Sequence, residues 1–216
     1  MAKYTFTDTE KEQVKQAVKD LETVSCGEIV PYFVNSSDDY AEASWYTAGI
    51  FGGGIAALLA ILSYLWLLPM RVTPLEISLF ILGAFVLGFL IPVILPQSKR
   101  FIISKDRQAE RVNQRALQAF INEKVFETEE RVGILIFVSR VEHQVMVLGD
   151  EGISKKLKPE DWQHVVEEVI KGIKSDEIAQ GMVSAIALCK DLLLEHGFVR
   201  KSTDFNELDD GLRIED

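Results

Sequence analysis

The chain has 216 residues, 48% of them hydrophobic, and a formal net charge of −10 at pH 7. An acidic chain without a basic face is poorly suited to binding nucleic acid, so no nucleic-acid partner is expected. Cys26 and Cys189 show neither zinc-binding nor redox spacing. Two such cysteines fit a reducing compartment.

The first predicted element is a helix that begins after Thr7 and ends near Glu22. Thr7 and Glu10 have the spacing of a capping box, in which each side chain bonds the backbone of the other residue. Residues 28–34 follow as a mostly apolar, β-rich run, typical of a strand buried on both faces. Pro31 within this run argues against a central position in the sheet unless a bulge accommodates it.

Two long apolar stretches come next, residues 47–68 and residues 77–95, and neither contains a charged residue. Each is long enough to cross a hydrocarbon core of about 30 Å at about 1.5 Å per residue. The connection from Pro69 to Pro74 has turn chemistry. Residues 44–96 are therefore predicted to form a two-helix transmembrane hairpin, with the rest of the chain on one side of the membrane.

The distribution of Lys and Arg predicts which side that is. No Lys or Arg occurs in residues 20–70, and the turn contributes only Arg71. Basic residues gather after the second span instead: Lys99, Arg100, Lys105, Arg107, Arg111 and Arg115. Such a bias places both termini in the cytoplasm. We expect a two-pass integral protein of a bacterial inner membrane, whose partners include the lipid bilayer.

Side chains at the ends of the spans are expected to anchor the hairpin, and small residues within the spans to pack it. The anchors are Trp45, Tyr46, Lys99 and Arg100. Small residues recur every four positions at Gly49, Gly53 and Ala57 in the first span and at Ala84 and Gly88 in the second. These residues let two backbones approach, either within the hairpin or between two copies in a homo-oligomer.

The remainder of the chain predicts helices and strands of one soluble domain. They are a helix over residues 105–123, a central strand over 133–139, its antiparallel partner over 144–148, and helices from near Pro159 and over 178–195. The first two strands are separated by a crossover and should pair in parallel. Residues 1–43 and 97–198 thus form two parts of one α/β domain with a small mixed sheet, and residues 199–216 a disordered acidic tail.

Four segments resemble the TPM domain family: GEIV at 27–30, VGILIFV at 132–138, LGDEGI at 148–153 and IAQGM at 178–182. The resemblance implies an α/β/α sandwich attached to membranes, with roles in maintaining membrane protein complexes. Some members are described as acid phosphatases, and some as calcium-binding. The commoner form has a secretory signal, an exported domain and a carboxy-terminal anchor. Here the hairpin is internal and the domain is expected to be cytoplasmic.

Phosphatase chemistry would need a nucleophile or a metal. The sequence has no Cys followed five residues later by Arg, no strand ending in Asp-x-Asp and no Gly-x-Ser-x-Gly elbow. Covalent catalysis is therefore not supported, whereas carboxylates could still hold a divalent metal such as calcium. The candidate clusters are Asp38, Asp39 and Glu42, ranked first because they follow a strand's carboxyl end, and Asp150 with Glu151. Solvated loop carboxylates are the simpler interpretation of both.

The leading interpretation is a membrane-anchored, cytoplasmic-facing TPM-like domain. It would serve as a binding or assembly and maintenance module for membrane protein complexes, with no required cofactor. The alternative is a metal-dependent acid phosphatase.

Overall fold

The computed structural model describes residues 4–67, 73–201 and 205–215. The chain divides into two compact units. The hairpin unit is Asp38–Gln108, and the sheet unit is Ala2–Ser37 together with Ala109–Asp216. The hairpin unit therefore extends beyond the predicted limits of 44 and 96, because short segments on both sides fold with the two long helices.

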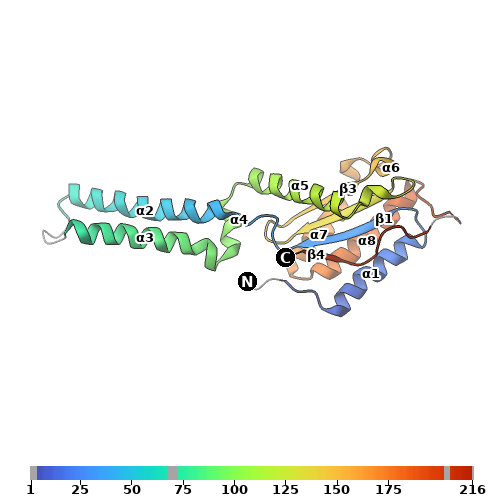
Figure 1. Cartoon of the computed structure of the whole chain (residues 1–216), viewed down its shortest axis with the longest axis horizontal. Coiled ribbons are helices and arrows are strands. Elements are labelled where there is room, and N and C mark those ends of the chain that lie inside the picture. The colour runs from blue at the N-terminus through green and yellow to red at the C-terminus, as the bar shows by residue number, and fades with distance from the viewer. Residues whose placement is uncertain (1–3, 68–72, 202–204, 216) are drawn as a thin grey trace. The chain divides into compact units, whose positions relative to one another are not determined.

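The two long helices of the hairpin unit are α2 (Ala41–Tyr64) and α3 (Pro74–Ile94), which run antiparallel in Figure 1. A capping box between Thr73 and Glu76 opens α3, with Pro74 at its first position. Both helices are long and apolar enough to cross a membrane. The predicted turn lies largely outside the described residues, and so does Arg71.

Close approach of α2 and α3 depends on Gly88 and Gly52. A Cβ atom on Gly88 would lie 2.6 Å from the carbonyl oxygen of Thr47, and one on Gly52 would lie 3.2 Å from the Phe85 ring. By contrast, a Cβ on Gly49 or Gly53 would meet no described atom within 4 Å. Gly49 and Gly53 therefore do not pack the hairpin, because both lie on a face of α2 that α3 does not cover, and their packing between two copies stays a prediction. Ala57 is exposed, and Ala84 is half-buried.

Short helices follow α3 in the hairpin unit. They are η1 (Pro96–Ser98) and α4 (Lys99–Ile102), after which α5 (Lys105–Asn122) begins and continues into the sheet unit. Tyr40, Ala43 and Ile103 form a small buried cluster. The buried side chain of Gln108 donates to the carbonyl oxygens of Arg100 and Ile103 at 2.8 and 2.7 Å. The base of the hairpin is thus packed and internally hydrogen-bonded.

The sheet unit contains a four-stranded sheet in the order β3-β2-β1-β4. Its strands are β1 (Glu28–Val34), β2 (Gly133–Ser139), β3 (Gln144–Gly149) and β4 (Arg213–Glu215). β1 pairs in parallel with β2, from Glu28 opposite Gly133, while β2 and β3 are antiparallel. Both pairings were predicted and are confirmed.

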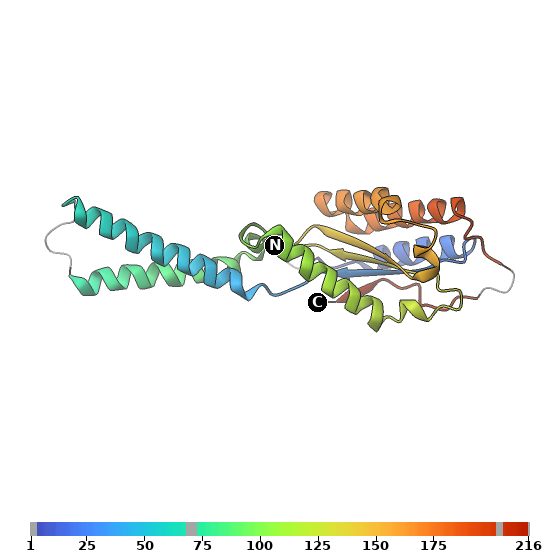
Figure 2. The same ribbon diagram turned by 90° about the horizontal axis from the view of Figure 1, so that it is seen from above.

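Helices cover both faces of the sheet. Besides α5, the longer helices of the sheet unit are α1 (Asp8–Glu22), α7 (Gln163–Ser175) and α8 (Ile178–Glu195). Its short helices are η2 (Val125–Glu127), α6 (Glu151–Ser154) and η3 (Pro159–Trp162). On one face Ile29 and Ile134 pack under α1, α7 and α8; on the other, Val30 and Leu135 pack under α5. Figure 2 shows these layers from above. The α/β/α sandwich with a small mixed sheet is confirmed.

The carboxy-terminal segment differs from the prediction. Residues 205–215, here called the strap, lie along the sheet unit, and Arg213–Glu215 pair in parallel with residues 32–34 of β1. Expecting disorder there was wrong, because Leu208 and Leu212 pack on the two cores and β1 has an open edge for β4. That pairing makes β1 a central strand despite Pro31, since β4 begins to pair only at Tyr32, one residue beyond the proline.

Candidate functional site

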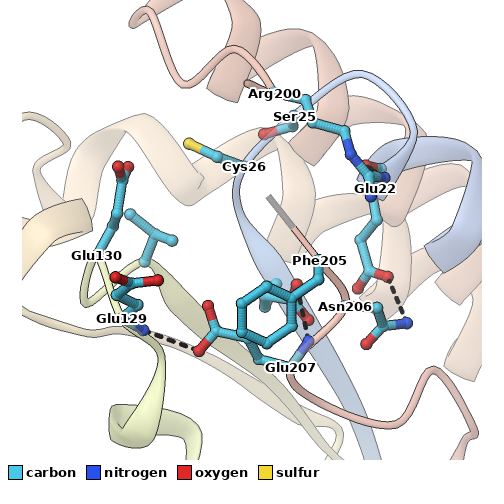
Figure 3. Close-up of a pocket in the computed structure, with 11 residues that line it drawn as sticks. Glu22, Ser25, Cys26, Glu129, Glu130, Arg200, Phe205, Asn206 and Glu207 are labelled. Carbon is cyan, nitrogen blue, oxygen red and sulfur yellow. Dashed lines mark hydrogen bonds between the residues drawn. The ribbon is translucent and has the colours of Figure 1, made fainter. Parts of the chain in front are cut away.

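A pocket of about 180 Å³ lies at the end of the sheet where β1 begins (Figure 3). It is lined by the last turn of α1, the loop into β1, the loop before β2 and the strap. The lining residues are Glu22, Ser25, Cys26, Glu28, Glu129, Glu130, Val132, Arg200, Phe205, Asn206 and Glu207. Carboxylates dominate this set, and Glu22, Glu28 and the neighbouring Asp210 are buried.

Buried carboxylates of this pocket hold the strap in place. The two carboxylate oxygens of Glu28 accept from the backbone N–H groups of Glu207 and Leu208 at 3.3 and 3.2 Å. Glu22 accepts from the Ile29 N–H at 3.4 Å and from the Asn206 side chain at 3.3 Å. As Figure 3 shows, Asn206 points its amide toward Glu22. These carboxyl groups therefore act first as acceptors for the polypeptide itself.

Burial changes the protonation of these carboxylates. It raises the pKa of Glu22 to about 9, with further contributions from the nearby charges of Glu28 and Asp210. Burial also raises the pKa of Glu28, although the two strap N–H groups work in the opposite direction. Glu22 is consequently protonated at neutral pH and can donate a hydrogen bond within the cluster.

The arrangement is suited to keeping Glu22 protonated and to binding the strap. A protonated Glu22 is a poor ligand for a hard cation, and the Glu28 oxygens already accept from backbone N–H groups. Within the part of the chain that the structure describes, no group of three or more His, Cys, Asp or Glu side chains is placed to hold a metal ion.

The first predicted metal cluster is not assembled. Asp38 accepts from the backbone N–H of Asp39 at 2.7 Å, and the Lys99 ammonium donates to the carbonyl oxygen of Asp39 at 2.6 Å. The Glu42 carboxylate lies 3.6 Å from the guanidinium of Arg107. The structure places all three residues in the hairpin unit but does not bring their carboxylates into one group, because each has a different neighbour.

The second predicted pair, Asp150 and Glu151, is engaged by basic side chains. Asp150 is buried and lies 2.7 Å from Arg131 Nε. Glu151 is exposed and pairs with Lys155 at 2.8 Å, four residues along the chain. These contacts neutralise both carboxylates locally, and neither is directed at a shared site.

The predicted anchor residues lie at one end of the hairpin unit. Trp45 and Tyr46, in the second turn of α2, are 62% and 59% exposed, and Lys99 and Arg100 belong to α4 after the end of α3. The Trp45 ring packs edge-on against Phe89 of α3, with centroids 5.2 Å apart. Aromatic and basic side chains thus cluster where the apolar helices end.

Sequence reasoning missed the cluster of Glu22, Glu28 and Asp210. A signal was available for the first two, since one glutamate ends a helix and the other starts a strand predicted to be buried. Asp210 gave no such signal, because the segment around it is rich in charge and was interpreted as disordered.

Comparison with known proteins agrees with this architecture. Residues 98–192 match the family model of the TPM domain. The NMR structure of the BA42 protein from the psychrophilic bacterium Bizionia argentinensis has the same fold, with a TM-score of 0.60 and 17% identity, over 100% of this chain and 99% of that one. Curated proteins gave no match. The sequence resemblance is therefore confirmed over residues 98–192, and the fold is a mixed α/β sandwich into which a hairpin of two apolar helices is inserted.

Proposed function

We propose that the chain is a two-pass membrane protein whose TPM domain binds other membrane proteins and helps to assemble or maintain their complexes on the cytoplasmic face. The exposed apolar surface of α2 and α3 carries the proposal. Large side chains along both helices are exposed, including Ile50, Ile61, Leu79, Leu87 and Val93.

Exposure of this kind distinguishes α2 and α3 from the core helices of a soluble protein. Only 17% of the most apolar 18-residue stretch of α2 is buried, and only 11% of that of α3. Leaving a large aliphatic or aromatic side chain in water costs about 1.5–3 kcal/mol each, so a continuous apolar surface of this length needs a cover. Lipid supplies that cover, and helices satisfy their own backbone hydrogen bonds within it.

The binding role is supported by the state of the pocket in the sheet unit. Glu22 is protonated at neutral pH and Glu28 is occupied by the strap, so the two are poorly placed to activate water on a metal. A domain of this kind is better suited to presenting surfaces than to hydrolysis.

Anchoring and orientation are tested together in membranes. The full chain should remain in the membrane pellet after alkaline carbonate extraction. A reporter that fluoresces only in the cytoplasm should be active when fused after Asp216, and a reporter active only outside should work when inserted next to Arg71. Release by carbonate, or the reverse reporter pattern, would overturn the proposed topology.

The assembly role is tested by affinity purification of the full chain from mild detergent, followed by mass spectrometry of co-eluting membrane proteins. Partners should disappear when residues 28–34 are scrambled, which destroys the sheet, and should persist in a matched variant such as Glu12→Gln on the exposed side of α1. Hydrolysis of a phosphomonoester by the purified chain with a divalent metal, abolished by Asp38→Asn or Asp150→Asn, would favour the phosphatase alternative.

A further inference from the structure

A second pocket, of about 720 Å³, lies at the base of the hairpin, entirely within the hairpin unit. It is formed by the first turns of α2, the short helix α4 and the beginning of α5. Its lining residues are Glu42, Tyr46, Ile50, Phe101, Ile102, Ile103, Ser104 and Arg107. The pocket is large enough to take a headgroup together with the first part of an acyl chain.

The lining has an apolar part and a polar part. Tyr46, Ile50 and Phe101 are 59%, 68% and 86% exposed, which leaves three large apolar side chains open to the surroundings. Glu42, Ser104 and Arg107 supply the polar part. A ligand that fills both parts must therefore be amphipathic.

Arg107 and the start of α5 favour a phosphate group. The backbone N–H of Arg107 donates to Ser104 Oγ at 3.4 Å, so Ser104 caps the helix and its positive end opens on the pocket. The Arg107 side chain is 48% exposed and therefore accessible from the pocket. A guanidinium beside a helix N-terminus is well suited to a phosphate monoanion.

Glu42 favours a cation that can donate hydrogen bonds. Its Oε1 atom is buried and has no hydrogen-bond partner among the described residues. The nearest guanidinium nitrogen, Arg107 Nε, lies 3.6 Å away, which is beyond normal hydrogen-bond distance. Glu42 lines the pocket and its side chain is 32% exposed, so an ammonium group in the pocket can contact the carboxylate, although Oε1 itself is closed to solvent until that contact forms. An unsatisfied carboxylate oxygen gains most from a charged N–H donor.

We propose that this pocket binds phosphatidylethanolamine from the surrounding membrane leaflet. The ammonium contacts Glu42, the phosphate contacts Arg107 and the start of α5, and one acyl chain lies along Ile50 and Phe101. Phosphatidylcholine lacks N–H donors for Glu42, and phosphatidylglycerol lacks a cation, so both bind more weakly. The inference rests on the proposed membrane anchoring and adds the identity of a bound lipid.

The test is native mass spectrometry of the full chain in detergent micelles, titrated with the three lipids carrying identical acyl chains. Phosphatidylethanolamine should bind about tenfold more tightly than phosphatidylcholine, as expected for one hydrogen bond to a charged group. Glu42→Gln should remove that preference. Arg107→Gln should weaken the binding of both phosphatidylethanolamine and phosphatidylcholine. Asp106→Asn is the control for Glu42→Gln, because it also removes one negative charge but at a residue that does not line the pocket. It should leave the preference unchanged.

Equal binding of the three lipids would overturn the inference, and so would a preference that survives Glu42→Gln. Thermal unfolding of each variant identifies a folding defect, and Arg107→Lys, which keeps the charge, should retain much of the phosphate contact. Flotation of the chain with vesicles of phosphatidylcholine alone tests the anchoring separately. A chain that floats but shows no preference contradicts only the lipid site, whereas a chain that does not float contradicts the proposed function.

Discussion

At the scale of single residues, the buried carboxyl of Glu22 makes stability depend on pH. Its folded-state pKa of about 9 lies above the ordinary value of 4.5, so the folded state holds a proton that the unfolded state releases. Stabilisation by this proton is complete below the pKa that Glu22 has in the unfolded state. It is lost as the pH rises toward the pKa that Glu22 has in the folded state. The chain should therefore be less stable at pH 8.5 than at pH 5.5.

We expect Glu22→Gln to flatten this dependence, because the amide keeps the shape of the protonated acid without titrating. Between pH 5.5 and 8.5 the free energy of unfolding should fall by about 1–2 kcal/mol more in the wild type than in the variant. This corresponds to a difference of roughly 2–8 °C in the change of Tm. Differential scanning calorimetry at both pH values gives the comparison. Glu12→Gln, on the exposed side of α1, is the control, and parallel curves for wild type and Glu22→Gln would contradict the assignment.

Gly88 and Gly53 should respond differently to the same substitution. Gly88→Val places a side chain against the Thr47 carbonyl and should separate α2 from α3, at a cost of about 1–3 kcal/mol, whereas Gly53→Val meets open space. The measurement is the disulfide yield between Gly52→Cys and Phe85→Cys, with the native cysteines replaced. Equal yields in both backgrounds would show that the helices do not meet at Gly88.

At the scale of elements, local patterns were predicted well and long-range polar contacts were not. The Thr7–Glu10 capping box and the antiparallel pairing of β2 with β3 are encoded by neighbouring residues, so the sequence was sufficient. The strap was missed because its acidic composition is typical of a solvated tail. The acceptors of its N–H groups, such as Glu28, lie nearly the whole chain away. Charge alone cannot reveal that a carboxylate will be buried as an acceptor.

Removal of residues 205–216 should destabilise the sheet unit. The deletion removes β4 and leaves the Glu28 carboxylate without the N–H donors of Glu207 and Leu208, which we expect to cost about 2–5 kcal/mol. Thermal unfolding of the truncated chain against the full chain measures the loss. Phe205→Ser, at an exposed position of the same segment, should change little. An unchanged Tm after the deletion would restore the original interpretation of a disordered tail.

At the scale of the whole molecule, the hairpin unit is inserted between two strands that pair directly. β1 precedes the insertion, β2 follows it, and the two pair along their entire length. The sheet unit is consequently one compact structure assembled from two separated parts of the sequence.

Replacing residues 44–96 with a flexible Gly/Ser linker should preserve cooperative unfolding, because loop-closure entropy rises only slowly with length. Residues 97–216 alone should not unfold cooperatively, since they lack β1 at the centre of the sheet and α1 above it. Calorimetry and amide exchange of the two proteins provide the measurement. Identical melting of both would show that residues 1–43 are an independent arm.

The central position of β1 also sets an order of events during translation. β1 leaves the ribosome before either of its neighbours, and two apolar helices must be synthesised before β2 can pair with it. β4, its other neighbour, follows every other described helix and strand in the chain. Both edges of an apolar strand therefore stay open while the hairpin is synthesised, and open strand edges are prone to aggregate. The centre of the domain therefore closes only after both the hairpin and β4 have been synthesised.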